Sequence, residues 1–191
     1  MTQDLETMTF DSAEAFEAWL AEHHSVRPGI WLRIRKKTPG VVALDYAQAL
    51  DVALCYGWID GQKAKLDDVW WLQRFTPRTR TSRWSKINRD KVAALIAQGR
   101  MRPPGQAEID RAKADGRWEA AYDSPKAATV PDDLAAALAA EPAAAAFFET
   151  LDGRNRYAVL YRIQDAKRAE TRARRIATYV AMLAKGEKLH P

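Results

Sequence analysis

The segment from Arg74 to Arg89 concentrates positive charge. It holds six cations and no acid, and the nearest acids outside it are Asp68 and Asp90. The cations are Arg74, Arg78, Arg80, Arg83, Lys86 and Arg89, with hydroxyl groups between them at Thr76, Thr79, Thr81, Ser82 and Ser85. Arginine presents a planar fork of donors that matches phosphate and carboxylate oxygens. The pattern indicates an anion-binding surface or, alternatively, a solvated basic loop.

A helix is expected to begin near Lys86, directly after most of these cations. Ser82 or Ser85 would then lie at its N-terminus, where free backbone N–H groups and the positive end of the helix dipole favour an anion. The alternative is that Ser85 is an ordinary N-cap. We expect five side chains to converge on one surface cavity there: Arg74, Arg78, Ser82, Ser85 and Asn88.

Four of the seven tryptophans lie in or beside the same segment, at positions 58, 70, 71 and 84. Neighbouring residues of a strand face opposite sides of a sheet, so Trp70 and Trp71 cannot both face one core. We expect one of them to be exposed, where an indole ring can stack on a base or a sugar. The alternative is that helices cover both faces and all four rings belong to the core.

Asp60 and Gln62 place polar groups next to the basic segment. If Ile59 points into the core, Asp60 and Gln62 share the opposite face of the strand. We expect Asp60 to form a structural salt bridge with Arg74 or Arg78. Its alternative role is that of a general base or a hydrogen-bond acceptor for a ligand.

These patterns predict one set of ligand-binding residues: Trp58, Asp60, Gln62, Arg74, Arg78, Ser82, Trp84, Ser85 and Asn88. A second basic cluster lies near the C-terminus, where Arg168, Arg172 and Arg175 share one helix face. We interpret it as a solvated face, with a nucleic-acid contact as the alternative. No His, Cys or carboxylate cluster has metal-ligand spacing and no glycine-rich phosphate loop occurs, so neither a metal nor a cofactor is predicted.

Periodicity and capping patterns predict the elements that must position these residues. Strands are expected over 30–36, 58–66 and 69–75, and helices over 12–24, 45–57, 85–99, 104–114, 132–140, 142–151, 154–165 and 168–185. The fold class is therefore α+β, with a small antiparallel sheet of about three strands packed against helices. We expect residues 1–122 to form this domain, 123–131 to be a linker, and 132–191 to form an all-helical module that packs on the first domain.

Composition and the N-terminal sequence indicate where in the cell the protein is expected. The chain has 191 residues, 47% of them hydrophobic, and a net charge of +5. The N-terminus lacks an apolar signal segment and no run reaches the length of a membrane span, so we expect a cytoplasmic protein without a membrane partner. The single cysteine, Cys55, lies in an apolar run and is expected to be a buried, inert side chain.

Several motifs together resemble the YdeI/OmpD-associated family. They are 57–61 (GWIDG), 74–78 (RFTPR), 82–88 (SRWSKIN), 99–101 (GRM), 166–167 (AK) and 170–176 (ETRARRI). The resemblance implies an α+β domain followed by a helical one, and it brings the roles of bacteriocin protection and association with a porin. It brings no catalytic residues.

The residues favour a binding protein that presents a basic, aromatic groove to a small anionic ligand carrying phosphate or carboxylate. One alternative is single-stranded nucleic acid; another is an enzyme with Asp60 as the acid or base beside Arg74 and Arg78; a third is an interaction or stress protein without a small ligand. An open groove with exposed tryptophan and arginine would favour nucleic acid, whereas a closed pocket around a buried Asp60 would favour the enzyme.

Overall fold

The computed structural model describes residues 5–36 and 43–191. The chain divides into two compact units. The first unit comprises Met1–Trp84 and Asn88–Ala120, and the second comprises Ser85–Ile87 and Ala121–Pro191. Within the described residues, no helix combines the length and the apolar character needed to cross a membrane.

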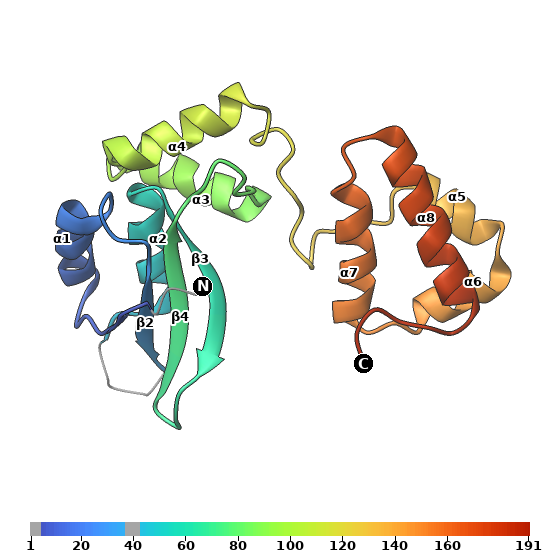
Figure 1. Ribbon diagram of the computed structural model, residues 1–191, viewed down its shortest axis with the longest axis horizontal. Coiled ribbons are helices and arrows are strands. Elements are labelled where there is room, and N and C mark those ends of the chain that lie inside the picture. Colours follow the sequence, from blue (N-terminus) through green and yellow to red (C-terminus); the bar gives the residue numbers. More distant parts are fainter. Residues whose placement is uncertain (1–4, 37–42) are drawn as a thin grey trace. The chain divides into compact units, whose positions relative to one another are not determined.

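The first unit is built on a four-stranded mixed sheet (Figure 1). Its strands are β1 (Thr7–Met8), β2 (Ile30–Arg35), β3 (Trp58–Lys65) and β4 (Trp70–Pro77), in the spatial order β1-β2-β4-β3. The pairs β2–β4 and β3–β4 are antiparallel, as predicted. Strand β1 runs parallel to β2 and was not predicted. A two-residue strand is too short to show the alternation by which a strand is recognised in sequence.

Four helices accompany the sheet. They are α1 (Ala13–His23), α2 (Tyr46–Cys55), α3 (Lys86–Ala97) and α4 (Pro103–Ala114). Helices α1 and α2 cover one face of the sheet: the Phe16 ring lies 6.0 Å from that of Phe75, and the Tyr46 ring lies 5.9 Å from that of Trp71. Helices α3 and α4 lie beyond the end of the sheet opposite the β3–β4 hairpin turn (Figure 1).

Side-chain caps set the first residues of α1 and α2. Asp45 and Gln48 form a reciprocal capping box at α2, as their spacing indicates. At α1 the cap is Ser12, whose hydroxyl accepts from the Ala15 backbone N–H at 3.2 Å. Ser12 is the residue directly before the helix, so only its side chain is placed to reach the third helical N–H.

The core of the first unit lies between the sheet and these helices. Ile30, Leu32 and Ile34 alternate along β2 and are all buried. The end of α2 meets the start of α4 closely: a Cβ on Gly57 would lie 2.9 Å from the Pro104 carbonyl oxygen, and Gly57 has a φ of +72°. Glycine therefore lets the chain turn from α2 into β3 beneath α4.

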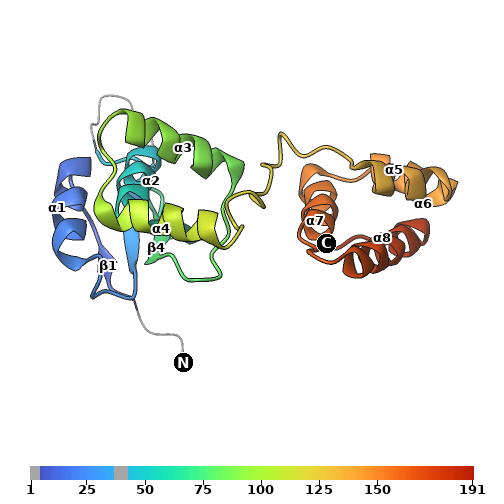
Figure 2. The same ribbon diagram turned by 90° about the horizontal axis from the view of Figure 1, so that it is seen from above.

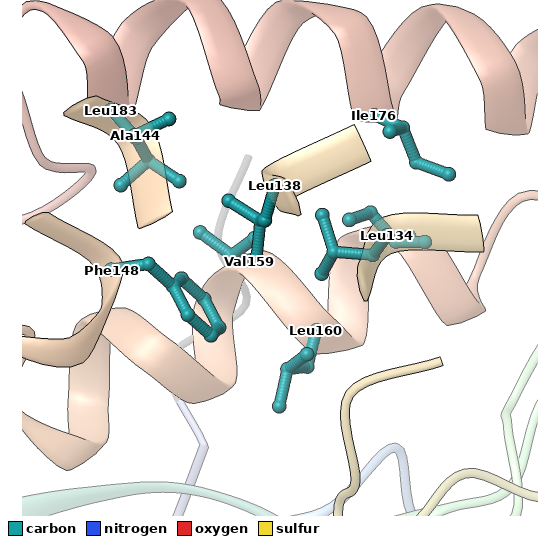
Figure 3. Packing of buried hydrophobic residues seen from close by; sticks show 9 residues of the cluster. Leu134, Leu138, Ala144, Phe148, Val159, Leu160, Ile176 and Leu183 are labelled. Atoms are coloured by element: carbon teal, nitrogen blue, oxygen red, sulfur yellow. The ribbon is translucent and has the colours of Figure 1, made fainter. Parts of the chain in front are cut away.

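The second unit is a group of four helices, α5 (Asp132–Ala139), α6 (Pro142–Glu149), α7 (Gly153–Gln164) and α8 (Ala169–Ala184). Helix α8 packs against the other three (Figures 1 and 2). Their apolar stripes form one buried cluster, which includes Leu134, Phe148, Val159, Ile176 and Leu183 (Figure 3). The apolar stripe of α8 is thus covered by the other helices of its own unit.

Candidate functional site

The cations of the Arg74–Arg89 segment lie in different environments and do not form one surface. Arg80 is exposed in the loop after β4, whereas Arg78 is only 5% exposed. Arg89 donates to the Trp118 carbonyl oxygen at 2.9 Å, and its guanidinium lies 5.0 Å from the centre of the Trp118 ring. Because these side chains have separate partners, they do not gather around one ligand although they are close in sequence.

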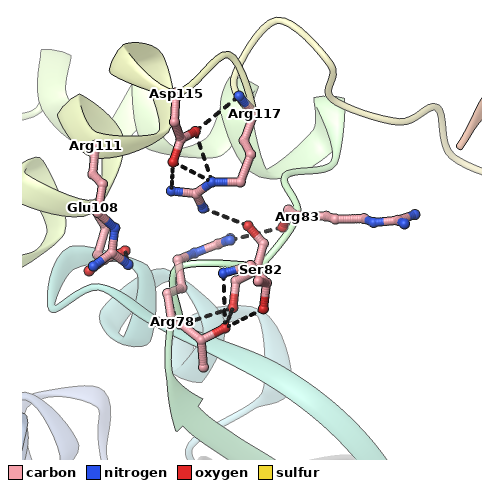
Figure 4. A network of polar contacts seen from close by, with 9 residues as sticks. Arg78, Ser82, Arg83, Glu108, Arg111, Asp115 and Arg117 are labelled. Carbon is pink, nitrogen blue, oxygen red and sulfur yellow. Dashed lines mark hydrogen bonds and ion pairs between the residues drawn. The ribbon is translucent and has the colours of Figure 1, made fainter. Parts of the chain in front are cut away.

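Arg78 is the centre of a buried network that fixes the loop between β4 and α3 (Figure 4). Its guanidinium lies over the Trp84 ring, 3.6 Å from the ring centre, and donates to the Arg83 carbonyl oxygen at 3.0 Å. Arg117 donates to the Ser82 carbonyl oxygen at 2.7 Å from the other side. Two guanidinium groups thus satisfy backbone carbonyls of this loop, which is a structural role.

Acids from α4 and the residues after it balance this charge. Asp115 pairs with Arg117 at 2.7 Å, and Glu108 pairs with Arg111. Burial raises the pKa of the Glu108 carboxyl, and the nearby guanidinium groups of Arg111, Arg117 and Arg78 oppose that shift. The network is therefore a mixed-charge cluster and not an unopposed anion site.

The N-terminus of α3 is partly occupied by the chain itself. Within the second unit, the Lys86 backbone N–H donates to the Tyr122 carbonyl oxygen at 2.9 Å, and the Lys86 ammonium pairs with Asp123 at 2.6 Å. Ser85 is buried and Asn88 is half-buried. Arg78 and Ser82 lie in the loop before this helix end, whereas Arg74 lies on β4. The convergence of the five side chains on one cavity stays a prediction.

Two of the tryptophans expected at the binding surface are core residues instead. Trp58 and Trp84 are each 1% exposed. The Trp58 indole N–H donates to the His24 carbonyl oxygen at 3.0 Å, and its ring meets the ring of Trp19 edge-on. Neither ring can stack on a ligand at the surface, because both are buried within the first unit.

Asp60 lies on the face of the sheet that α2 covers. Its carboxylate accepts from the Tyr46 hydroxyl at 2.8 Å, and its register partner on β4 is Phe75. Arg74, one residue before Phe75, therefore faces the other side of the sheet, so the expected salt bridge between Asp60 and Arg74 is wrong. An enzyme that uses both side chains on one ligand is disfavoured for the same reason.

In β3 the condition that Ile59 points into the core is not met, because Trp58, the first residue of the strand, takes the core position. Ile59 consequently faces away from α2, and the register shifts between Asp60 and Lys63. Such a bulge lets two residues oppose one and reverses the faces that follow. Gln62 lies in this bulge and is exposed, so it does not continue the row of Trp58 and Asp60.

The face of the sheet away from α1 and α2 carries a basic and aromatic surface, which we call the open face. Register and alternation place six side chains of β2 and β4 on it: Trp31, Arg33, Arg35, Trp70, Leu72 and Arg74. Arg33 is exposed and the other five are partly exposed. None of the strand residues on this face is an acid.

Two cross-strand pairs of tryptophan and arginine lie within the open face. Trp31 of β2 is directly opposite Arg74 of β4, and Arg35 of β2 is directly opposite Trp70. The Arg35 guanidinium lies 5.7 Å from the centre of the Trp70 ring. Trp71, the next residue of β4, faces α2, so the prediction that Trp70 and Trp71 lie on opposite faces is confirmed.

Of the open-face residues, only Arg74 was predicted to bind a ligand. Trp31, Arg33 and Arg35 lie outside the Arg74–Arg89 segment, so the charge density of that segment does not indicate them. The signal that finds them is the alternation in β2, where apolar residues at 30, 32 and 34 leave Trp31, Arg33 and Arg35 on the second face.

The second basic cluster, on α8, serves the packing of its own unit. Arg172 donates to both carboxylate oxygens of Asp133 and, at 3.1 Å, to the Ile163 carbonyl oxygen. Arg175 donates to the Arg162 carbonyl oxygen at the end of α7. These contacts join α8 to α5 and α7, whereas Arg168 is exposed.

Metal and thiol chemistry find little support among the described residues. No group of three or more histidines, cysteines and carboxylates in that part of the chain could hold a metal ion. Cys55 is buried, and this burial raises the pKa of its thiol to about 11. The thiol is therefore protonated at neutral pH, in keeping with its expected role as a small apolar side chain.

Comparison with known families gives two matches, one for each part of the chain. Residues 127–186, which contain the motif at 170–176, match the family described as Bacteriocin-protection, YdeI or OmpD-Associated. Residues 8–108, more than half of the chain and all of the open face, match a domain of unknown function, DUF8412. No curated protein and no solved structure matches. The chain thus belongs to the DUF8412 family and carries, after that domain, a YdeI/OmpD-associated domain of the family predicted from the sequence.

Proposed function

We propose that the open face binds an anionic ligand that carries phosphate or carboxylate groups next to a flat ring. The observation that supports this function is that two tryptophans lie directly opposite arginines on a sheet face whose strand residues include no acid. Arginine supplies the fork of donors for the anion, and the indole supplies a surface for the ring.

Among the described residues, no carboxylate forms an ion pair with Arg33, Arg35 or Arg74. The Arg35 guanidinium lies over the Trp70 ring, and Asp67, in the turn between β3 and β4, interacts electrostatically with Arg33 without pairing with it. Arg172, by contrast, is neutralised by Asp133. A guanidinium that is already paired gains little from a ligand, whereas an unpaired one gains a charge-assisted hydrogen bond. The open face therefore fits an incoming anion better than the α8 cluster does.

Neither family description names a ligand for the open face. We also propose a role in bacteriocin protection, which the name of the second family implies. Binding of an anion by the first unit is compatible with such a role, because it requires no chemistry from the helical unit.

The test is a titration with adenosine monophosphate, with neutral adenosine as the matched probe, followed by the indole N–H signals in NMR. We expect the monophosphate to shift the signals of Trp31 and Trp70 and to leave the buried Trp58 and Trp84 unchanged. Arg33→Glu should weaken binding about tenfold, because one charge-assisted contact becomes a repulsive one. Arg168→Glu, an equal charge reversal at an exposed position of the second unit, should have no effect.

Two results would oppose the proposal. The first is a shift of Trp58 or Trp84 without a shift of Trp31 or Trp70, which would move the site into the core. The second is equal binding by adenosine and its monophosphate, which would remove any role for the arginines.

A further inference from the structure

We infer that the ligand of the open face is a single-stranded nucleic acid, held by bases stacked on Trp31 and Trp70 and by phosphates on Arg33, Arg35 and Arg74. This inference rests on the proposed function and names the class of ligand. A polymer is inferred because the tryptophan–arginine pairs of this face are repeated and separated along the strands, not gathered around one point.

The spacing of the two tryptophan–arginine pairs carries the argument. Trp31 and Arg74 form one pair, and Arg35 and Trp70 form the other, four residues further along β2. At about 3.3 Å per residue, the pairs are about 13 Å apart. At about 3.4 Å per stacked nucleotide, that distance corresponds to about four nucleotides. One small anion can use one pair, whereas a short strand can use both.

The residues between the two tryptophan–arginine pairs also fit a continuous nucleic-acid strand. Arg33 on β2 is directly opposite Leu72 on β4 between the two pairs, and Arg33 is exposed. A strand that runs from one pair to the other therefore passes a third cation and an apolar side chain. No acid lies on the strand residues of this face to repel its phosphates.

The aromatic rings favour single strands over duplexes and over polyanions without bases. In a duplex the bases are stacked within the helix, so their faces are closed to an indole ring, whereas single strands offer every base. Inorganic polyphosphate has the charge but no ring. A basic groove lined with aromatic rings is the usual arrangement for single-strand binding without sequence readout.

The experiment measures anisotropy of fluorescent thymidylate oligonucleotides of increasing length, at several salt concentrations, with the full chain. We expect affinity to rise steeply up to about four nucleotides and slowly beyond. With three phosphates neutralised, log K should fall with log salt concentration with a slope of about −2, from about 0.7 per phosphate for single strands. A duplex of equal length should bind more weakly.

Variants assign the binding to the open face. Trp31→Leu and Trp70→Leu should each lower oligonucleotide affinity about tenfold, the usual loss for one stacked base. Arg33→Glu, which changes an exposed side chain and leaves the core intact, should lower affinity and make the salt slope shallower by about one phosphate. Arg168→Glu should match the wild type.

The outcomes separate this inference from the proposed function. If adenosine monophosphate shifts Trp31 and Trp70 but longer oligonucleotides bind no tighter than it does, the anion site stands and the polymer inference fails. If neither probe acts on the open face, both fail. If inorganic polyphosphate binds as tightly as an oligonucleotide of equal charge and the tryptophan variants bind normally, stacking is not used and the inference is overturned.

Discussion

Replacing Arg78 with alanine should destabilise the first unit. The side chain is 5% exposed, lies over the Trp84 ring, and donates to the Arg83 carbonyl oxygen at 3.0 Å. Arg78→Ala removes both contacts and leaves space above the buried ring. The Arg83 carbonyl oxygen loses a charged donor. The loop from β4 to α3 then keeps the hydrogen bond from Arg117 to the Ser82 carbonyl oxygen.

The expected loss follows from these contacts. A desolvated cation–π contact contributes about 2 kcal/mol, and a hydrogen bond from a charged donor contributes about 1.5–3 kcal/mol. Because one side chain makes both, the two figures do not add in full, and we expect the free energy of unfolding to fall by about 2–4 kcal/mol. For a unit of this size that corresponds to a Tm lower by about 10 °C.

Tryptophan fluorescence during urea unfolding isolates the effect. All seven tryptophans lie in the first unit, so their emission follows that unit, whereas far-UV circular dichroism also follows the helices of the second unit. Arg80→Ala is the matched control, since Arg80 is exposed in the same loop and carries the same charge. If Arg78→Ala shifts the fluorescence transition no more than Arg80→Ala does, the Arg78–Trp84 contact does not stabilise the unit and our reasoning is wrong.

Three further predictions concern other parts of the chain. Asn155→Ala should release the C-terminal residues, because the buried Asn155 amide holds both the N–H and the carbonyl of His190; hydrogen exchange and carboxypeptidase digestion would detect the loss. Arg172 lowers the pKa of Asp133 in the folded state, so this pair stabilises the second unit above about pH 4 and ceases to do so as pH falls through the lowered pKa; Asp133→Asn should flatten that acid limb in melts followed by far-UV circular dichroism. The Cys55 thiol, with its pKa raised to about 11, should resist a disulfide reagent at pH 8 until the first unit unfolds; rapid labelling of the native protein would contradict its burial.

Local patterns predicted most elements of the fold. The capping box at Asp45, the alternation in β2, and the apolar stripe of α8 each depend on residues within a few positions, and the structure agrees with all three. The strand β1 was not predicted, because its two residues are extended through pairing with β2, which is distant in sequence.

The candidate site was harder to predict than the fold, since it depends on which side chains become neighbours. The acid-free run of cations in the sequence suggested one surface, yet Arg78 is buried on Trp84, Lys86 pairs with Asp123, and only Arg74 reaches the open face. Local charge density predicted that the arginines of this segment bind a ligand. It could not show that Arg78 and Arg89 instead contact backbone carbonyl oxygens and indole rings.

The sequence by itself determined the fold class, the helical nature of residues 132–184, the family of the C-terminal domain, and the opposite orientation of Trp70 and Trp71. Those properties follow from the helical and strand periods, which act over a few residues. Only the tertiary structure decided that Trp31 lies opposite Arg74 and that Arg35 lies opposite Trp70. Strand register arises from core packing and turn geometry across about 40 residues of chain, and a one-residue slip would turn every one of these side chains to the other face.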